Sequence, residues 1–212
     1  MKTYAILVAF TITLMVQSCL PLAEDFQYTP TPLNGKLKIS AWEFISQRTD
    51  FADFKTIIKA SGIDTLLYSQ TDKKYTYLLL NQAGVASLLK DKYANMTVAT
   101  VGTLTDTQKS DLKNRLLYHI IDGYYYGLPG GNLGFDPVNV STLWKDSFSI
   151  MVLKLDKDPS LTYSGLNDCR LGVNNYKPLA DPAFRAITSN LFVTNGVMDV
   201  LGNYASYDLV SR

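Results

Sequence analysis

The residue of this chain best suited to acid–base chemistry or metal binding is its single histidine, His119, in the stretch LLYHIIDG. An imidazole titrates near neutral pH and is the commonest metal ligand in proteins. The chain has no second histidine, no HExxH motif and no CxxC pair, so a metal at His119 would have to recruit carboxylates alone. A Ser-His-Asp arrangement stays open, because its members can come from anywhere in the chain, but no GxSxG nucleophile elbow is present.

Carboxylates offer a second kind of chemistry. Glycosidases act through two carboxyl groups that lie about 5 to 9.5 Å apart. Four aspartates near expected loops and strand ends could supply such a pair: Asp136, Asp146, Asp156 and Asp158. No pair stands out, because acidic residues in such places are ordinarily solvated surface. We therefore predict a protein that is not an enzyme and uses neither a cofactor nor a metal, with a hydrolase acting on envelope glycans as the alternative.

The stretch DGYYYGLPGGNLGF places three tyrosines beside a glycine-rich loop. Tyrosine provides rigid, amphipathic contact area and a ring on which sugars can stack. The glycines do not form a phosphate-binding loop, since no GK[ST] follows and the spacing is not GxGxxG. Tyr124, Tyr125 and Tyr126 are thus a candidate ligand surface, and the alternative is that alternate tyrosines pack inward while the loop merely turns.

The element that positions His119 has clear local signals. Thr105 and Gln108 stand in capping-box spacing, and Gly123 suits the left-handed residue after a helix, which predicts a helix over 106–122. His119 follows Leu112 by seven residues, and at about 100° per residue it returns to within roughly 20° of the same direction. We therefore expect His119 to face the core and to serve the structure.

The other elements follow from caps, periodicity and turn residues. Ser40 and Asp50 are predicted to begin two helices, the second of which ends at Gly62. The runs KYTYLLLNQAG and SFSIMVLKLD are predicted strands, and Asn195-Gly196 marks a hairpin between two further strands. Between these strands, residues 157–190 form a long irregular stretch.

The first residues, MKTYAILVAFTITLMVQSC, are typical of a secretory signal, and their apolar run is too short for a transmembrane anchor. VQSC resembles the lipobox of bacterial lipoproteins. We therefore expect a signal peptide over 1–18, a lipidated Cys19 and an extended linker over 19–37, with ordinary cleavage near Ala23 as the alternative. A lipidated Cys19 would leave Cys169 without a partner for an intrachain disulfide, and the sequence assigns Cys169 no role.

Charge excludes two classes of partner. Removing residues 1–18 from the 212-residue chain leaves 194 residues, and because Lys2 goes with them, nineteen basic residues balance nineteen acidic ones. Proteins that bind nucleic acids or anionic membrane surfaces usually carry an excess of basic residues, so neither is an expected partner. The expected contact with a membrane is through the N-terminal lipid. With 47% hydrophobic residues, the chain can bury one core of ordinary size.

Three motifs, in this order, carry a resemblance to the fasciclin (FAS1) domain over about 40–204. YTYLLLNQAG from Tyr75 resembles the family's first block, Tyr118-His119 matches its Tyr-His pair, and NLFVTNGVMDVL from Asn190 resembles its second block. The matching positions, which we take as a structural motif, are Asn81, Tyr118, His119, Asn195 and Gly196. The chain departs from the family at Leu79, Gly84, Asp199 and Gly202, where proline, an aromatic residue, histidine and aspartate are usual.

The resemblance implies a single α+β domain over 38–212, in which a β-sheet wedge or sandwich packs against several helices. It also implies longer loops near 124–146 and 157–190, and a Tyr-His pair hydrogen-bonded in support of the core. By function, it implies a non-enzymatic domain for adhesion or for binding an extracellular or envelope protein or polysaccharide. Together with the lipobox, it suggests an outer-membrane lipoprotein of a Gram-negative bacterium, displayed at the cell surface, with a structural subunit of an envelope complex as the alternative.

Overall fold

The computed structural model describes residues 36–94, 96–127, 131–145, 150–157, 169–173 and 186–205. The chain divides into two units, Met1–Asn34 and Gly35–Arg212, and all of the described residues belong to the second. The expected signal peptide, lipidated Cys19 and the linker before Lys36 lie outside the described residues. Within the described ranges, no helix is long and apolar enough to cross a membrane.

Of the two predicted helix caps, Ser40 is confirmed and Asp50 is not. Helix α2 (Ala41–Gln47) starts at Ser40, whose hydroxyl and Glu43 form a reciprocal capping box. A short 3-10 helix, η1 (Thr49–Phe51), then leads into α3 (Ala52–Ser61), which ends at Gly62 with the predicted left-handed backbone, φ 68°. The prediction that Asp50 caps the second helix is wrong, because its carboxylate instead pairs with Arg48, 2.9 Å away.

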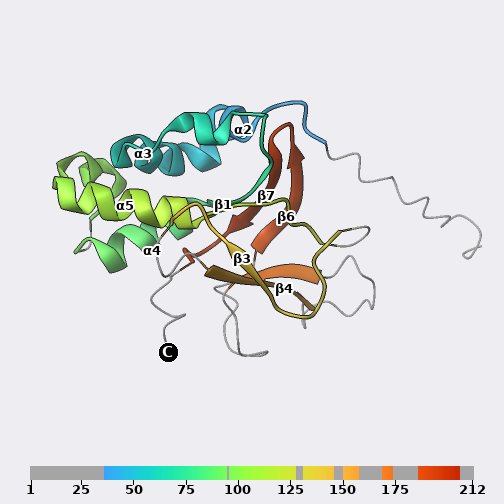
Figure 1. The fold of residues 1–212 in the computed structure, drawn as a ribbon. Helices are drawn as coiled ribbons and strands as arrows, with labels where there is room; N and C mark the ends of the chain where they lie inside the picture. The colour runs from blue at the N-terminus through green and yellow to red at the C-terminus, as the bar shows by residue number, and fades with distance from the viewer. Residues whose placement is uncertain are drawn as a thin grey trace, which may run out of the picture. The chain divides into compact units, whose positions relative to one another are not determined.

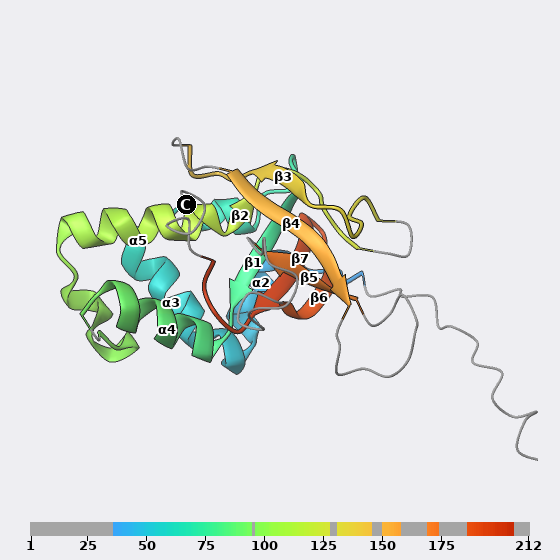
Figure 2. The same ribbon diagram turned by 90° about the horizontal axis from the view of Figure 1, so that it is seen from below.

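Four further helical elements lie within the described residues. They are η2 (Thr65–Tyr68), α4 (Gln82–Lys92), η3 (Val98–Thr103) and α5 (Asp106–Tyr118). Helix α3 contacts α2, α4 and α5 and so lies at the centre of this group. Figures 1 and 2 show α3, α4 and α5 together to one side of the strands.

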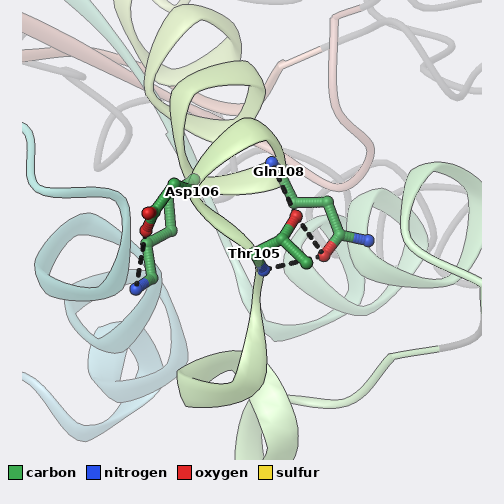
Figure 3. Close-up of polar contacts among 4 residues, drawn as sticks. Thr105, Asp106 and Gln108 are labelled. Carbon is green, nitrogen blue, oxygen red and sulfur yellow. Dashed lines mark hydrogen bonds and ion pairs between the residues drawn. The ribbon is translucent and has the colours of Figure 1, made fainter.

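The predicted start of α5 is confirmed, but its predicted end is wrong. The Thr105 hydroxyl accepts the Gln108 N–H at 3.3 Å while Gln108 Oε1 accepts the Thr105 N–H at 2.9 Å, as Figure 3 shows. The helix stops at Tyr118, because Ile120 and Ile121 form a short strand, β2, that pairs with Tyr77 and Thr76. Gly123, with φ 148°, follows this strand and does not end a helix.

One sheet lies at the centre of the domain. Its strand order is β2-β1-β7-β6, with β1 (Tyr75–Leu80) parallel to β7 (Gly196–Leu201) and β6 (Ala186–Val193) antiparallel to β7. Every residue of β1 and β7 is buried, so both faces of these two strands are covered. The predicted hairpin at Asn195-Gly196 is confirmed as the connection between β6 and β7.

Side chains alternate between the two faces of the sheet along β1, and two neighbouring residues show what covers each face. The Tyr77 ring stacks on Tyr68 of η2 with centroids 5.5 Å apart, so its face of the sheet is covered by the helical part. Thr76 points the other way, and its hydroxyl donates a hydrogen bond to the Gly123 carbonyl at 3.0 Å. The segment after β2 therefore crosses the face that the helices leave open.

A second, antiparallel sheet has the order β3-β4-β5. It consists of β3 (Val138–Ser141), β4 (Ile150–Lys157) and β5 (Cys169–Val173). The strand predicted in SFSIMVLKLD is confirmed as β4. The prediction of irregular structure over 157–190 is wrong in part, because this stretch includes β5 and the start of β6.

Motif residues and a candidate binding surface

His119 is a core residue with both ring nitrogens engaged. Its exposed fraction is 1%. Nε2 accepts the Ala205 N–H at 2.9 Å, which leaves Nδ1 to carry the proton and donate to the Arg115 carbonyl at 2.7 Å. Burial lowers the pKa of the imidazole to about 4, so the ring is neutral at physiological pH. This arrangement leaves His119 no free nitrogen with which to take a substrate proton or bind a metal.

Tyr118 and His119 form the motif pair through their rings. The two rings meet edge to face with centroids 6.3 Å apart, and Tyr118 makes a similar contact with Trp144 at 6.2 Å. The Tyr118 side chain is completely buried. The pair therefore packs the end of α5 against the segment that follows β3.

Asn195 connects three parts of the domain. Its Oδ1 accepts the Ala41 N–H at 3.0 Å, and its Nδ2 donates to the Tyr68 carbonyl at 2.9 Å and to the Tyr77 hydroxyl at 2.7 Å. The side chain is fully buried. It thus satisfies backbone groups of α2 and η2 from the hairpin between β6 and β7, which is a structural role.

The remaining motif residues also serve the backbone. Gly196 has φ 159°, and a Cβ at this position would collide with the Tyr75 carbonyl oxygen. Asn81 caps α4, because its Oδ1 accepts the Gly84 N–H at 3.0 Å. Like the Tyr-His pair, both positions serve the structure, Gly196 in the hairpin and Asn81 at the start of α4.

The three consecutive tyrosines do not share one surface. Tyr124 and Tyr126 lie with Phe192 of β6, with ring centroids 5.1 Å, 5.3 Å and 6.3 Å apart, and all three are half-buried. We call these three residues the aromatic cluster. Tyr125 packs against the hydrophobic core instead. Of the expected surface of Tyr124, Tyr125 and Tyr126, the first and last therefore lie together beside Phe192, whereas Tyr125, also half-buried, contacts the core.

Hydrogen bonds hold the backbone that carries the two outward tyrosines. The Thr76 hydroxyl accepts the Tyr125 N–H at 2.8 Å. Asn132 spans the loop, with Oδ1 accepting the Tyr126 N–H at 3.0 Å and Nδ2 donating to the Tyr124 carbonyl at 2.8 Å. The rings are therefore presented on a backbone whose polar groups are already paired, which reduces the entropy lost on binding a ligand.

A bulge in β6 is hydrogen-bonded to the end of the same loop. Opposite Asp199, the β6 strand carries an extra residue, and Asn190 adopts φ 61° there. The Asp199 carboxylate accepts the Asn190 N–H at 2.9 Å, and Asn190 Oδ1 accepts the Gly127 N–H at 2.9 Å. Asp199 has an exposed fraction of 2%, and burial raises the pKa of its carboxyl group to about 7.

The candidate carboxylates are only partly described. Asp136 is exposed, Asp146 and Asp158 lie outside the described residues, and Asp156 belongs to β4 with its side chain outside the description. Cys169 opens β5, and its side chain is likewise not described. In the part of the chain that the structure describes, no three His, Cys, Asp or Glu residues come together as a metal site.

An open groove of about 490 Å³ lies on the helical side of the sheet. It runs between η1 with the end of α2 and the β6 and β7 strands, and its apolar lining includes Phe44, Phe51, Leu191 and Val200. Ile187 also lines it and is half exposed. Sequence reasoning missed both this groove and the place of Phe192, because each joins segments that are distant along the chain.

Comparisons with known proteins bear on the fold. Neither a scan against protein-family models nor a search of curated proteins finds a match. Among solved structures, the chain is similar to a FAS1 domain pair from the insect cell adhesion molecule fasciclin I, with 14% sequence identity and a TM-score of 0.54. The match covers 81% of this chain and 52% of the other, so this chain spans about half the length of the domain pair. The fold is a single FAS1-like α+β domain, as the sequence motifs imply.

Proposed function

We propose that this chain is a non-enzymatic binding domain of the cell envelope that attaches to a protein or polysaccharide through the aromatic cluster. The observation that carries the proposal is the combination of half-buried rings with a hydrogen-bonded backbone at Tyr124 and Tyr126. The fold supports the proposal, since the similar solved structure comes from a cell adhesion molecule. The single histidine supports the non-enzymatic part of the proposal, because both of its ring nitrogens are hydrogen-bonded in the core.

Aromatic side chains on a held backbone are well suited to binding. A tyrosine or phenylalanine ring adds large contact area with only two rotatable bonds, and such residues dominate the binding energy of many interfaces. In the cluster, each ring also limits the motion of its neighbours, because the three centroids lie 5.1 to 6.3 Å apart. Little ordering therefore has to accompany the binding of a ligand.

The binding test compares variants on a panel of immobilised extracellular proteins and polysaccharides. We expect the double variant Tyr126→Ala and Phe192→Ala to bind any ligand found at least tenfold more weakly than the parent, with little change in fold by circular dichroism. Leu66→Ala is the matched control, because Leu66 is an apolar side chain of η2 with an exposed fraction of 62%. Equal binding by the parent and the double variant would refute the aromatic cluster as the contact surface.

The location in the envelope rests on the sequence before Lys36 and needs its own test. We propose that Cys19 is lipidated and that the domain is displayed outward from the outer membrane. Mass spectrometry of the native protein should detect a lipid that the Cys19→Ala variant lacks. Protease shaving of intact cells, with a periplasmic protein as control, should cleave the domain while the control survives. Protection until the outer membrane is broken would favour the structural-subunit alternative instead.

A further inference from the structure

We propose that the aromatic cluster and two lysines beside it, Lys36 and Lys74, form a binding site for acidic polysaccharides, whose sugar rings stack on the cluster while their carboxylates pair with the lysines. This inference rests on the proposed function and specifies the chemical class of its ligand. It is carried by the placement of two exposed cations on the face of the sheet that bears Phe192.

The pairing of backbones places Lys36 on the same face as Phe192. Lys36 forms a parallel bridge with Phe192, which pairs with Val197 of β7, which in turn pairs with Thr76 of β1. Residues paired across neighbouring strands direct their side chains to the same face. Lys36, Phe192 and Thr76 therefore lie on one face of the sheet, in that order across the strands. The Thr76 hydroxyl accepts a hydrogen bond from the backbone of the tyrosine segment.

Lys74 lies at the other end of the cluster. It precedes Thr76 by two residues, so alternation directs it to the same side of the sheet. Its ammonium group lies over the Tyr124 ring, with Nζ 5.4 Å from the centroid. One cation thus lies over Tyr124, and the other is carried by the residue whose backbone pairs with Phe192.

Both cations are available to a ligand. Lys36 and Lys74 are exposed, and in the described part of the chain neither forms an ion pair. The exposed carboxylates of Asp72 and Asp122 lie close to this region in sequence and moderate its potential. An exposed ion pair is worth up to about a fivefold change in affinity. We therefore expect the two lysines together to contribute about tenfold.

An extended peptide fits this surface less well than a glycan. Peptides that add to a sheet bind through the unpaired backbone of an edge strand. At the cluster that position is taken, because the Leu37 N–H donates to the Phe192 carbonyl at 2.7 Å. A sugar needs only part of an aromatic surface and a charge partner, and the cluster offers half-buried rings beside two exposed lysines. Single-stranded nucleic acid also stacks on aromatic rings, but its binding calls for a groove of many cations, whereas this chain has a formal net charge of +1.

The experiment measures binding of the full chain to polygalacturonate, alginate and fully methyl-esterified polygalacturonate by affinity electrophoresis at low and high salt. The methyl ester retains the sugar backbone of polygalacturonate but has no charged carboxylates. We expect the parent to bind an acidic polymer, to bind it several-fold more weakly at high salt, and to bind the ester about tenfold more weakly. The double variant Lys36→Gln and Lys74→Gln should bind the acidic polymer about tenfold more weakly than the parent.

The matched control is the double variant Lys90→Gln and Lys113→Gln, which removes two exposed lysines from α4 and α5. It should bind within twofold of the parent. Failure of the parent to bind either acidic polymer, equal binding of polygalacturonate and its ester, parent-like binding by the Lys36 and Lys74 variant, or tighter binding of an oligo-dT strand would each overturn the inference.

Failure of this inference can be told from failure of the proposed function. If the lysine variant binds a ligand as the parent does while the Tyr126→Ala and Phe192→Ala variant binds it more weakly, the cluster is a contact surface but not for acidic glycans. If neither variant changes the binding of any ligand, both the inference and the proposed contact surface are wrong. Thermal melts of every variant, which should stay close to that of the parent, exclude unfolding as the cause of lost binding.

Discussion

Replacing Asp199 with asparagine is expected to change how the stability of this domain depends on pH. Asp199 lies beneath the bulge of β6, almost completely buried, and accepts the Asn190 N–H at 2.9 Å. An asparagine there keeps an oxygen that can accept the same hydrogen bond but cannot ionise. The substitution therefore removes the proton equilibrium with little change in shape.

The magnitude follows from the pKa of the carboxyl group in the two states. Burial raises it from 3.8 to about 7 in the folded protein. Between these values the folded chain binds more protons than the unfolded chain, so the free energy of unfolding decreases as the pH rises. The interval of about 3 pH units, at about 1.4 kcal/mol per unit, corresponds to about 4 kcal/mol. This contribution of Asp199 to the free energy of unfolding is present below pH 4 and absent above pH 7.

His119 has the opposite effect over nearly the same range. Burial lowers its pKa from 6.5 to about 4, so on acidification the unfolded chain takes up the proton first. The free energy of unfolding therefore decreases by about 3 kcal/mol as the pH falls from 6.5 to 4. These two contributions nearly cancel in the parent, and each becomes visible only when the other residue is replaced.

The assay is urea unfolding of the parent and of Asp199→Asn at several values between pH 4.5 and 8. We expect the free energy of unfolding of the variant, minus that of the parent, to increase by about 3 kcal/mol across this range. Asp136→Asn makes the same change at an exposed position and controls for net charge. A difference between Asp199→Asn and parent that stays constant with pH would refute the reasoning, because the carboxyl group would then not resist ionisation in the folded state.

Three other substitutions test the roles of single side chains. Asn195→Ala leaves the Ala41 N–H, the Tyr68 carbonyl and the Tyr77 hydroxyl without their partner in the core. In urea titrations it should lower the free energy of unfolding by about 3 kcal/mol or more. A loss below about 1 kcal/mol would contradict the connecting role of Asn195. Thr105→Ala removes the cap of α5 and should cost about 1 kcal/mol, seen as a fall of about 2 to 4 °C in melting temperature. Tyr125→Ala should destabilise the domain by about 2 kcal/mol while leaving ligand binding within twofold, and weakened binding without destabilisation would mean that Tyr125 contacts the ligand.

Signals between residues close along the chain predicted the elements they govern. The capping box of Thr105 and Gln108, the stop at Gly62 and the Asn195-Gly196 hairpin all formed as expected. The direction of His119 also followed from helical spacing alone, and the order of the three motifs indicated the FAS1-like fold. The caps, the hairpin and the direction of His119 depend on hydrogen bonds and periodicity within a few residues, which a single sequence contains completely. The fold was indicated by the resemblance of the motifs to a known family.

The tertiary structure decided the features that depend on distant partners. Helix α5 ends at Tyr118 because Ile120 and Ile121 find β1, about forty residues earlier in the chain, and no local signal opposes a longer helix. Phe192 joins Tyr124 and Tyr126, and Asp199 is buried, only because the bulge of β6 meets the loop after β2. A chain encodes its local hydrogen bonds directly, whereas the neighbours that bury a carboxylate or complete an aromatic surface are set by packing across the whole domain.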